Sequence, residues 1–225
     1  PGIKIVGATY SGDPNSAGIY SEGNTISPDA TPSDTGVILS TGRASDFTNA
    51  TGEANQIASR TTDTSGADGD ADLNALAGSQ TYDAAIFQAD FIPDGSTLTM
   101  QITFSSEEYL EYVGSGFNDA VGIWVNGQKA ELTVGNGDIS IDNINPNRNG
   151  NLFVDNRQDQ YNTEMDGFTV TLTLKAPVIP GQVNRIKIGI ADGGDAEYDS
   201  NLLIAADSIQ TAVVAGDDSF TIGQN

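Results

Sequence analysis

Large apolar residues occupy every second position along three stretches of the chain. Residues 97–104 read TLTMQITF, residues 168–174 read FTVTLTL, and residues 186–190 read IKIGI. Side chains alternate between the two faces of a β-strand, so this period of two is typical of a strand with one buried face. The three stretches are therefore predicted to be strands.

Denser apolar runs predict further strands. Residues 121–125 read VGIWV and are followed by Asn126–Gly127, the strongest short signal for a hairpin turn, with Leu132 and Val134 on the returning chain. Trp124 lies within this run, so we expect it to pack in the core rather than stack on a ligand. Shorter runs at 37–39, 85–91 and 202–206 add three more predicted strands.

Helical periodicity is confined to short segments. Residues 73–76 and 107–112 could each form one helical turn, but no stretch beyond about ten residues keeps a 3.6-residue period. Short strands separated by Gly, Asn and Asp predict an all-β fold, a β-sandwich or jelly roll, in one domain over residues 1–212. Residues 213–225 are interpreted as a linker or the start of the next tandem module, which makes the chain a fragment of a larger protein.

Composition adds a strong acidic bias. The 225 residues carry a net charge of −22, and the acids are 23 Asp against 8 Glu. A surface acidified only for solubility has no reason to avoid Glu, whereas short Asp side chains suit turns and oxygen-rich cation sites. The absence of Cys and His excludes disulfides, zinc thiolates, imidazole-bound metals and Ser–His–Asp or Cys–His catalysis.

The charge also limits the partners. A surface of −22 repels phosphate and carries no basic stripe, so nucleic acid is not expected as a partner. No apolar run approaches the roughly 20 residues of a membrane span, so membrane insertion is not expected. Like charge also disfavours self-association, which predicts a monomer.

Three acidic clusters are candidates for calcium binding. Asp68, Asp70 and Asp72 form a D-x-D-x-D run that resembles the first half of an EF-hand loop, but Ser79 stands where the closing Glu would be. The EF-hand is therefore rejected, and the run is either another kind of calcium loop or a solvated acidic turn.

A second cluster follows two predicted strands. Asp192, Asp195 and Asp199 fall within eight residues after the strand at 186–190, where they repel one another unless a cation compensates. Glu107 and Glu108 follow another strand and would join them if both strand ends share one rim, with Asn118 and Asp119 completing the set. The alternatives are an ordinary Gly-rich loop and a solvated helical turn.

The third region mixes acids and amides. Its oxygens suit calcium, which takes six to eight oxygen ligands, but most of these residues also favour turns. Its members are Asp138, Asp142, Asn143, Asn145, Asp155, Asn156 and Asp166.

Ordered motifs over most of the chain resemble one known family. They are TGVILSTG (35–42), DADL (70–73), FSSEEYLEYVGSGFNDAVGIWV (104–125), DGFTVTL (166–172), the Ala176–Pro177 and Pro180–Gly181 pairs, and KIGIADGGDAEYDSNLLI (187–204). In this order they resemble the signatures of choice-of-anchor L domains, over roughly residues 35–210.

The resemblance implies a domain of large bacterial surface and secreted proteins. The chain is most similar to the peptide-binding domain of calcium-dependent RTX adhesins, which sits near the tip of a giant protein between Ig-like extenders. Those domains grip the carboxyl-terminal residues of partner proteins with the help of calcium. The implied role is attachment to other cells or to a host, with biofilm formation, outside the bacterial cell.

The motif acids and the acidic clusters together predict where several calcium ions would bind, and the strand-end positions of the acids predict where a ligand would enter. The metal candidates are Asp68, Asp70, Asp72, Glu107, Glu108, Asn118, Asp119, Asp192, Asp195 and Asp199. The ligand-binding candidates are Glu108, Asn118, Asp119, Asp166, Asp195, Tyr198, Asp199 and Ser200. Asp70 is assigned to a structural ion, and an open calcium position is expected near Asp119 and Asp195.

Four functions are compatible with an acidic, cation-binding β-domain. The leading prediction is an adhesion module in which calcium accepts a peptide carboxylate as its last ligand. A calcium-dependent lectin-like module, in which sugar hydroxyls take that position, and a spacer stiffened by calcium are the alternatives. Paired carboxylates such as Glu107 and Glu108 with Asp119 could hydrolyse glycosides only at a suitable separation across a cleft, and no enzyme is predicted.

Overall fold

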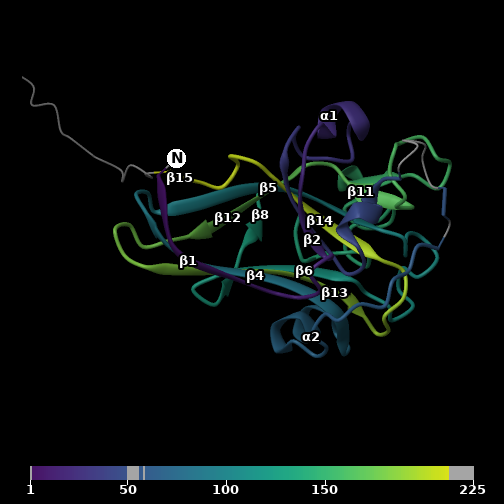
Figure 1. Ribbon diagram of the computed structural model, residues 1–225, viewed down its shortest axis with the longest axis horizontal. Helices are drawn as coiled ribbons and strands as arrows, with labels where there is room; N and C mark the ends of the chain where they lie inside the picture. The colour runs from purple at the N-terminus through teal and green to yellow at the C-terminus, as the bar shows by residue number, and fades with distance from the viewer. Residues whose placement is uncertain (1, 50–55, 58, 213–225) are drawn as a thin grey trace, which may run out of the picture.

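The computed structural model describes residues 2–49, 56–57 and 59–212, which form two β-sheets packed face to face (Figure 1). Every strand pair in this part of the chain is antiparallel. The predicted all-β sandwich is therefore confirmed. Residues 213–225, interpreted above as a linker, lie outside the described residues.

The first sheet has the order β1 (Ile3–Ser11), β4 (Thr81–Pro93), β13 (Asn184–Gly193), β6 (Ala120–Val125) and β7 (Gln128–Lys129), with β9 (Ile139–Ser140) beside β6. The second sheet has the order β10 (Phe153–Asp155), β11 (Gly167–Thr169), β5 (Thr97–Ser106), β14 (Ser200–Ala205), β3 (Gly36–Ser40) and β2 (Ala17–Tyr20). Also on this sheet, β12 (Leu172–Pro177) and β15 (Gln210–Ala212) pair with β5, and β8 (Glu131–Leu132) pairs with β12.

The helical segments are short. They are α1 (Gly23–Ile26), α2 (Ala71–Ala77) and two 3₁₀ turns, η1 (Ala44–Phe47) and η2 (Gly150–Leu152). The predicted helical turn at 73–76 belongs to α2, whereas residues 107–112 form irregular turns.

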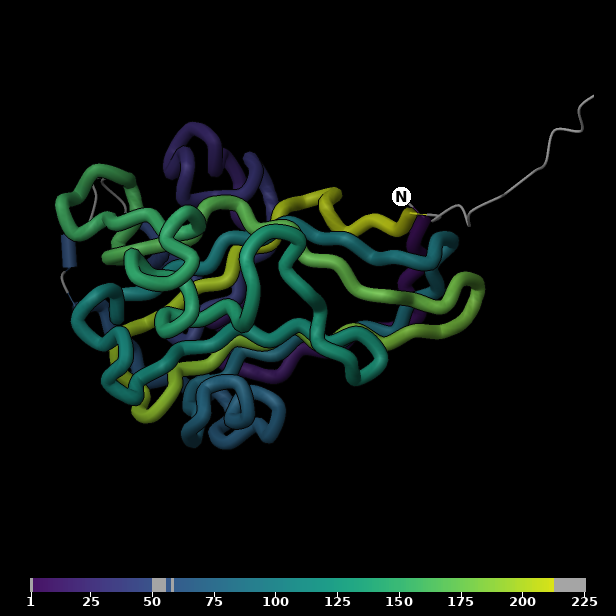
Figure 2. The backbone as a smooth tube through the Cα atoms, turned by 180° about the vertical axis from the view of Figure 1, so that it is seen from behind, coloured from purple at the N-terminus to yellow at the C-terminus, as the bar shows by residue number. Residues whose placement is uncertain are grey.

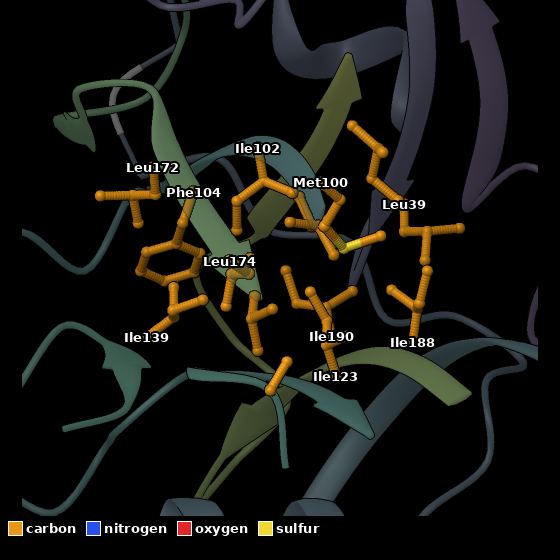
Figure 3. Close-up of a cluster of buried hydrophobic side chains, with 14 of the residues drawn as sticks. Leu39, Met100, Ile102, Phe104, Ile123, Ile139, Leu172, Leu174, Ile188 and Ile190 are labelled. Atoms are coloured by element: carbon orange, nitrogen blue, oxygen red, sulfur yellow. The ribbon is translucent and has the colours of Figure 1, made fainter. Parts of the chain in front are cut away.

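The core lies between the two sheets and is built from the alternating residues that predicted the strands. From the second sheet, Met100, Ile102 and Phe104 point inward along β5, and they are fully buried. Ile188 and Ile190 of β13 meet them from the first sheet (Figure 3). At about 25 cal/mol per Å² of buried apolar surface, such side chains each contribute roughly 2 kcal/mol to folding.

Two sequence-based expectations need correction. The single strand expected at 168–174 is divided into β11 and β12, because its pairing with β5 shifts by one residue between Phe168–Ser105 and Leu172–Ile102. Trp124 is half-buried on the outer face of the first sheet rather than in the central core. There the Lys187 ammonium lies 5.2 Å from its ring centroid, a cation–π distance.

The sheet registers define two poles of the sandwich. At one pole β1 begins and β15 ends, and the Thr211 hydroxyl donates to the Gly2 carbonyl at 2.9 Å. At the other pole Thr81, the first residue of β4, pairs with Gly193, the last residue of β13. The strand ends that carry the predicted acids lie at this second pole.

Candidate functional site

The ends of strands from both sheets meet at the second pole. Ser106, which ends β5, pairs with Ser200, which begins β14. In the first sheet, β13 ends beside the start of β6. Residues 106–119 and 191–200 therefore lie together, and we call these two segments the acidic rim. In Figure 2 the rim lies at the left, away from the end marked N.

Asp119 links the segments of the rim. Its Oδ1 accepts the Gly193 N–H at 2.9 Å, and its Oδ2 accepts the Ser200 hydroxyl at 2.6 Å. The side chain is completely buried, and burial raises the pKa of Asp119 to about 7. One carboxylate thus ties the end of the first sheet to the second.

Glu108 is buried beside Asp119. Its backbone N–H donates to the Ser106 hydroxyl, but its Oε2 is buried with no hydrogen-bond partner among the described residues. Burial, followed by the charges of Asp119, Asp195 and Asp142, raises the pKa of Glu108 to about 10. The site therefore disfavours an uncompensated negative charge on this side chain.

Asp192 lies at the end of β13 in the same environment. The residue is 1% exposed, and neither carboxylate oxygen makes a hydrogen bond of normal geometry within the described chain. Burial, followed by the charge of Asp119, raises the pKa of Asp192, while the Thr41 side chain acts in the opposite direction. Asp192 was predicted from sequence as a metal ligand, and the burial of its carboxylate adds a physical reason to expect a cation beside it.

Asp199 and Glu107 each use one carboxylate oxygen to hold the segment after residue 59. The Thr62 N–H donates to Asp199 Oδ1 at 2.8 Å, and the Arg60 N–H donates to Glu107 Oε1 at 3.0 Å. The second oxygens, Asp199 Oδ2 and Glu107 Oε2, are buried and unpartnered in the part of the chain that is described. Burial raises the pKa of Glu107 to about 8 and the pKa of Asp199 to about 7.

Gly42 makes room for the Asp199 carboxylate. A Cβ at position 42 would stand 1.9 Å from Asp199 Oδ2, which no real side chain tolerates. Segment 35–42, which carries one of the motifs above, therefore helps to form the rim because Gly42 has no side chain where the Asp199 carboxylate lies.

Glu107 and Glu108 are adjacent in sequence but belong to two different groups of charges. The acids that act on Glu107 are Asp166, Glu164 and Asp199, whereas those that act on Glu108 are Asp119, Asp195 and Asp142. The rim therefore has two acidic centres, at Glu107 and at Glu108, which overlap because Asp199 also acts on Asp119 and Asp192.

These centres fit a hard cation by ligand chemistry. A buried carboxylate without a partner costs on the order of several kcal/mol, unless a proton or a cation neutralises it. Calcium takes oxygen ligands in irregular geometry, and carboxylate, amide, hydroxyl and carbonyl oxygens are all present here. Among the described residues no three acidic side chains form a complete metal-binding group, so neutral oxygens and water would have to complete the shell.

The more accessible side of the rim combines polar and aromatic groups. Asn118, Asp195 and Tyr198 are half-buried. The Tyr198 ring centroid lies 5.0 Å from that of Tyr112, which in turn lies 5.8 Å from that of Phe117. A ligand at this side would meet carboxylate and amide oxygens next to aromatic rings.

Most residues predicted as ligands lie at this rim, but the D-x-D-x-D run does not. Asp70 caps α2 by accepting the N–H groups of Asp72 and Leu73, and Lys187 Nζ lies 2.8 Å from the carboxylates of both Asp70 and Asp72. Asp68 is exposed. A lysine thus already neutralises two of the three acids.

Sequence reasoning missed two buried acids. Glu164 is fully buried and accepts the N–H groups of Gln56 and Ile57. Asp83 is 2% exposed within β4. Neither stands in an acidic run, so the sequence carried no signal for them. Asp142, predicted as a member of the third region that suits either calcium or turns, acts on Glu108, and Asp166, predicted to bind ligand, is half-buried near Glu107.

Together, the two sheets and the acidic rim define this protein as a β-sandwich module with buried acids at one pole. The choice-of-anchor L domain family matches residues 2–210, and the chain belongs to this family. Membership indicates a surface-associated module. No helix in the described part of the chain is long and apolar enough to cross a membrane.

Comparison with solved structures gives only remote similarities. A β-glucosidase from Kluyveromyces marxianus in complex with glucose is 13% identical, with a TM-score of 0.22, over 56% of this chain and 11% of that one. TmCBM61 in complex with β-1,4-galactotriose is 10% identical, with a TM-score of 0.29, over 89% of this chain and 86% of that one. A family 35 carbohydrate-binding module from an environmental isolate is 19% identical, with a TM-score of 0.26, over 66% and 91%.

At these TM-scores the similarities carry no argument about function. This chain also spans only a small part of the β-glucosidase. No curated protein matches the sequence.

Proposed function

We propose that this domain is a calcium-dependent binding module of a bacterial surface adhesin and that it grips the carboxyl terminus of a partner protein at the acidic rim. One observation carries the proposal. Carboxylate oxygens of Glu107, Glu108, Asp192 and Asp199 are buried at one pole without hydrogen-bond partners among the described residues. Calcium at the two acidic centres would neutralise them.

The same ions would reverse the local charge. A peptide carboxylate approaching a domain of net charge −22 is repelled. A calcium ion held by Glu108 and Asp195, with one coordination position open, would attract that carboxylate and bind it directly. Binding would then require both calcium and a free carboxyl terminus.

The position of the rim supports attachment. The chain enters β1 and leaves β15 at one pole, while the rim lies at the other pole. A monomeric module held by neighbouring domains at its first pole would leave the rim facing outward. The family and this geometry support a location outside the cell, in an RTX-type adhesin that mediates cell or host attachment and biofilm formation.

The test is a paired array experiment. Random peptides with free carboxyl termini, the same peptides as carboxyl-terminal amides, and a glycan panel are each probed in millimolar calcium and in EDTA. Binding to free-acid peptides in calcium alone is the expected result, with calorimetry on the best peptide and its amide as confirmation.

Three results would contradict the proposal. Equal binding of free-acid and amide peptides would mean that no carboxylate enters a cation site. Calcium-dependent binding of glycans without peptides would assign the open position to sugar hydroxyls, as in a lectin-like module. Binding to neither array would favour a spacer stiffened by calcium.

A further inference from the structure

Asp83 occupies an irregularity in the first sheet. Ile190 of β13 pairs with Ala85 and Asp192 pairs with Tyr82, so two residues of β4 oppose the single Ala191. This is a β-bulge, and the φ of Asp83 within it is 52°, in the left-handed region. Bulges turn a side chain away from the direction that a regular strand gives it.

The Asp83 carboxylate is buried with half of its hydrogen-bonding capacity unused. Oδ1 accepts the Thr64 N–H at 3.2 Å and the Thr64 hydroxyl at 2.9 Å. Oδ2 is buried and has no hydrogen-bond partner among the described residues. A strained backbone and an unpartnered carboxylate at one residue are both unfavourable unless something is bound there.

The segment at 63–69 covers this carboxylate. Ala67 forms a bridge with Ala84, and the Gly69 N–H donates to the Thr81 carbonyl at 2.8 Å. Gly66 passes so close that a Cβ there would stand 2.5 Å from the Asp83 carbonyl carbon. Backbone and hydroxyl oxygens of the segment are thus held near Asp83.

The charges around the segment are all of one sign. Asp63 and Asp68 raise the pKa of Asp83, after the larger effect of burial. Asp13 accepts the Ser65 hydroxyl at 2.7 Å on the same segment. None of the ion pairs found in the described residues includes any of these four acids.

We propose that Asp83 Oδ2 is the anchoring ligand of a divalent-cation site that fastens the 63–69 segment to β4, next to the rim residue Asp192, which pairs with Tyr82. An all-oxygen, irregular environment selects calcium over magnesium. This site assigns different roles to the three acids of the D-x-D-x-D run. Lys187 neutralises Asp70 and Asp72, and Asp68 is left to contribute charge beside Asp83.

The test is the isosteric variant Asp83→Asn. Asn keeps an oxygen for the Thr64 donors and tolerates a positive φ, so the fold is retained. Asp207→Asn is the matched control, because Asp207 has a φ of 56° and is exposed just after Ala205, the end of β14 opposite to the rim. Bound calcium is counted by calorimetry and native mass spectrometry in the wild type and both variants.

Asp83→Asn should bind one calcium ion fewer than the wild type, and Asp207→Asn the same number. In saturating calcium, amide hydrogen exchange over residues 63–69 should be at least about tenfold faster in Asp83→Asn, because the ion no longer holds the segment. In EDTA near pH 8 the same variant should melt at a higher temperature than the wild type, because an unpaired buried charge is gone. An unchanged ion count in Asp83→Asn would overturn the inference.

The outcome is separable from that of the rim. Loss of one ion in Asp83→Asn supports this site even if peptides bind without calcium, which would contradict only the proposed function. An unchanged count in Asp83→Asn with fewer ions in Asp119→Asn would overturn only the present site. A wild type that binds no calcium would overturn both.

Discussion

Asp119 shows how much of the site a sequence can reveal at the scale of single residues. Its place before a predicted strand indicated a polar rim, and the structure does place Asp192, Asp195 and Asp199 nearby. Nothing in the sequence pattern indicated that Asp119 would be fully buried between Gly193 and Ser200. Burial depends on contacts between distant segments, and it is burial that turns an acidic loop into a candidate cation site.

Asp195 provides the first test at this scale. It is half-buried, and within the described chain its side chain accepts a hydrogen bond only from the Glu197 N–H, so Asp195→Ala should fold normally. Loss of a charged contact to calcium should weaken peptide binding by about 2 kcal/mol or more. Calorimetry with a free-acid peptide measures the change, and wild-type affinity in this variant would place the ligand elsewhere.

At the scale of elements, alternation predicted the strands with one buried face and failed where that pattern is absent. The central β5 and β13 were found because the first part of each strand buries every second residue, although the second part is buried throughout. β1 was missed because it is an edge strand with almost all residues exposed and a bulge between Ile5 and Gly7. Asp83 escaped notice because a bulge inside β4 turns the side chain, and a bulge has no period in the sequence.

Helix α2 gives a prediction at this scale. Asp70 caps its N-terminus and contacts Lys187, so Asp70→Ala removes a cap and a half-buried ion pair. The free energy of unfolding should fall by about 1 kcal/mol, while peptide affinity stays within about twofold of the wild type. Denaturant unfolding and calorimetry measure the two quantities. If Asp70→Ala abolished peptide binding while Asp195→Ala bound normally, the ligand would bind near α2 and not at the acidic rim.

At the scale of the whole molecule, the buried acids link stability to pH. In the folded chain the pKa values of Glu107, Asp119 and Asp199 lie at about 7 to 8, whereas unfolded carboxyls titrate near about 4. The folded state therefore binds more protons between these values. The stability from these groups is complete below about pH 4 and is lost as the pH rises through about 8.

In EDTA the melting temperature should accordingly fall by at least about 5 °C between about pH 5 and pH 8. Saturating calcium should flatten this dependence, because the ion replaces the protons on the same carboxylates. Differential scanning fluorimetry across this range measures both curves. A melting temperature in EDTA that rises with pH would show that the rim acids are already compensated within the chain.

The most direct test of the account is thermal unfolding of the wild type near neutral pH in EDTA, in millimolar magnesium and in millimolar calcium. A ligand at 100 times its dissociation constant adds about 2.7 kcal/mol of stability per site, so several calcium sites should raise the melting temperature by more than about 10 °C. Magnesium should have a much smaller effect, because it requires regular octahedral geometry. Identical melting curves in calcium and in EDTA would contradict a cation-binding rim.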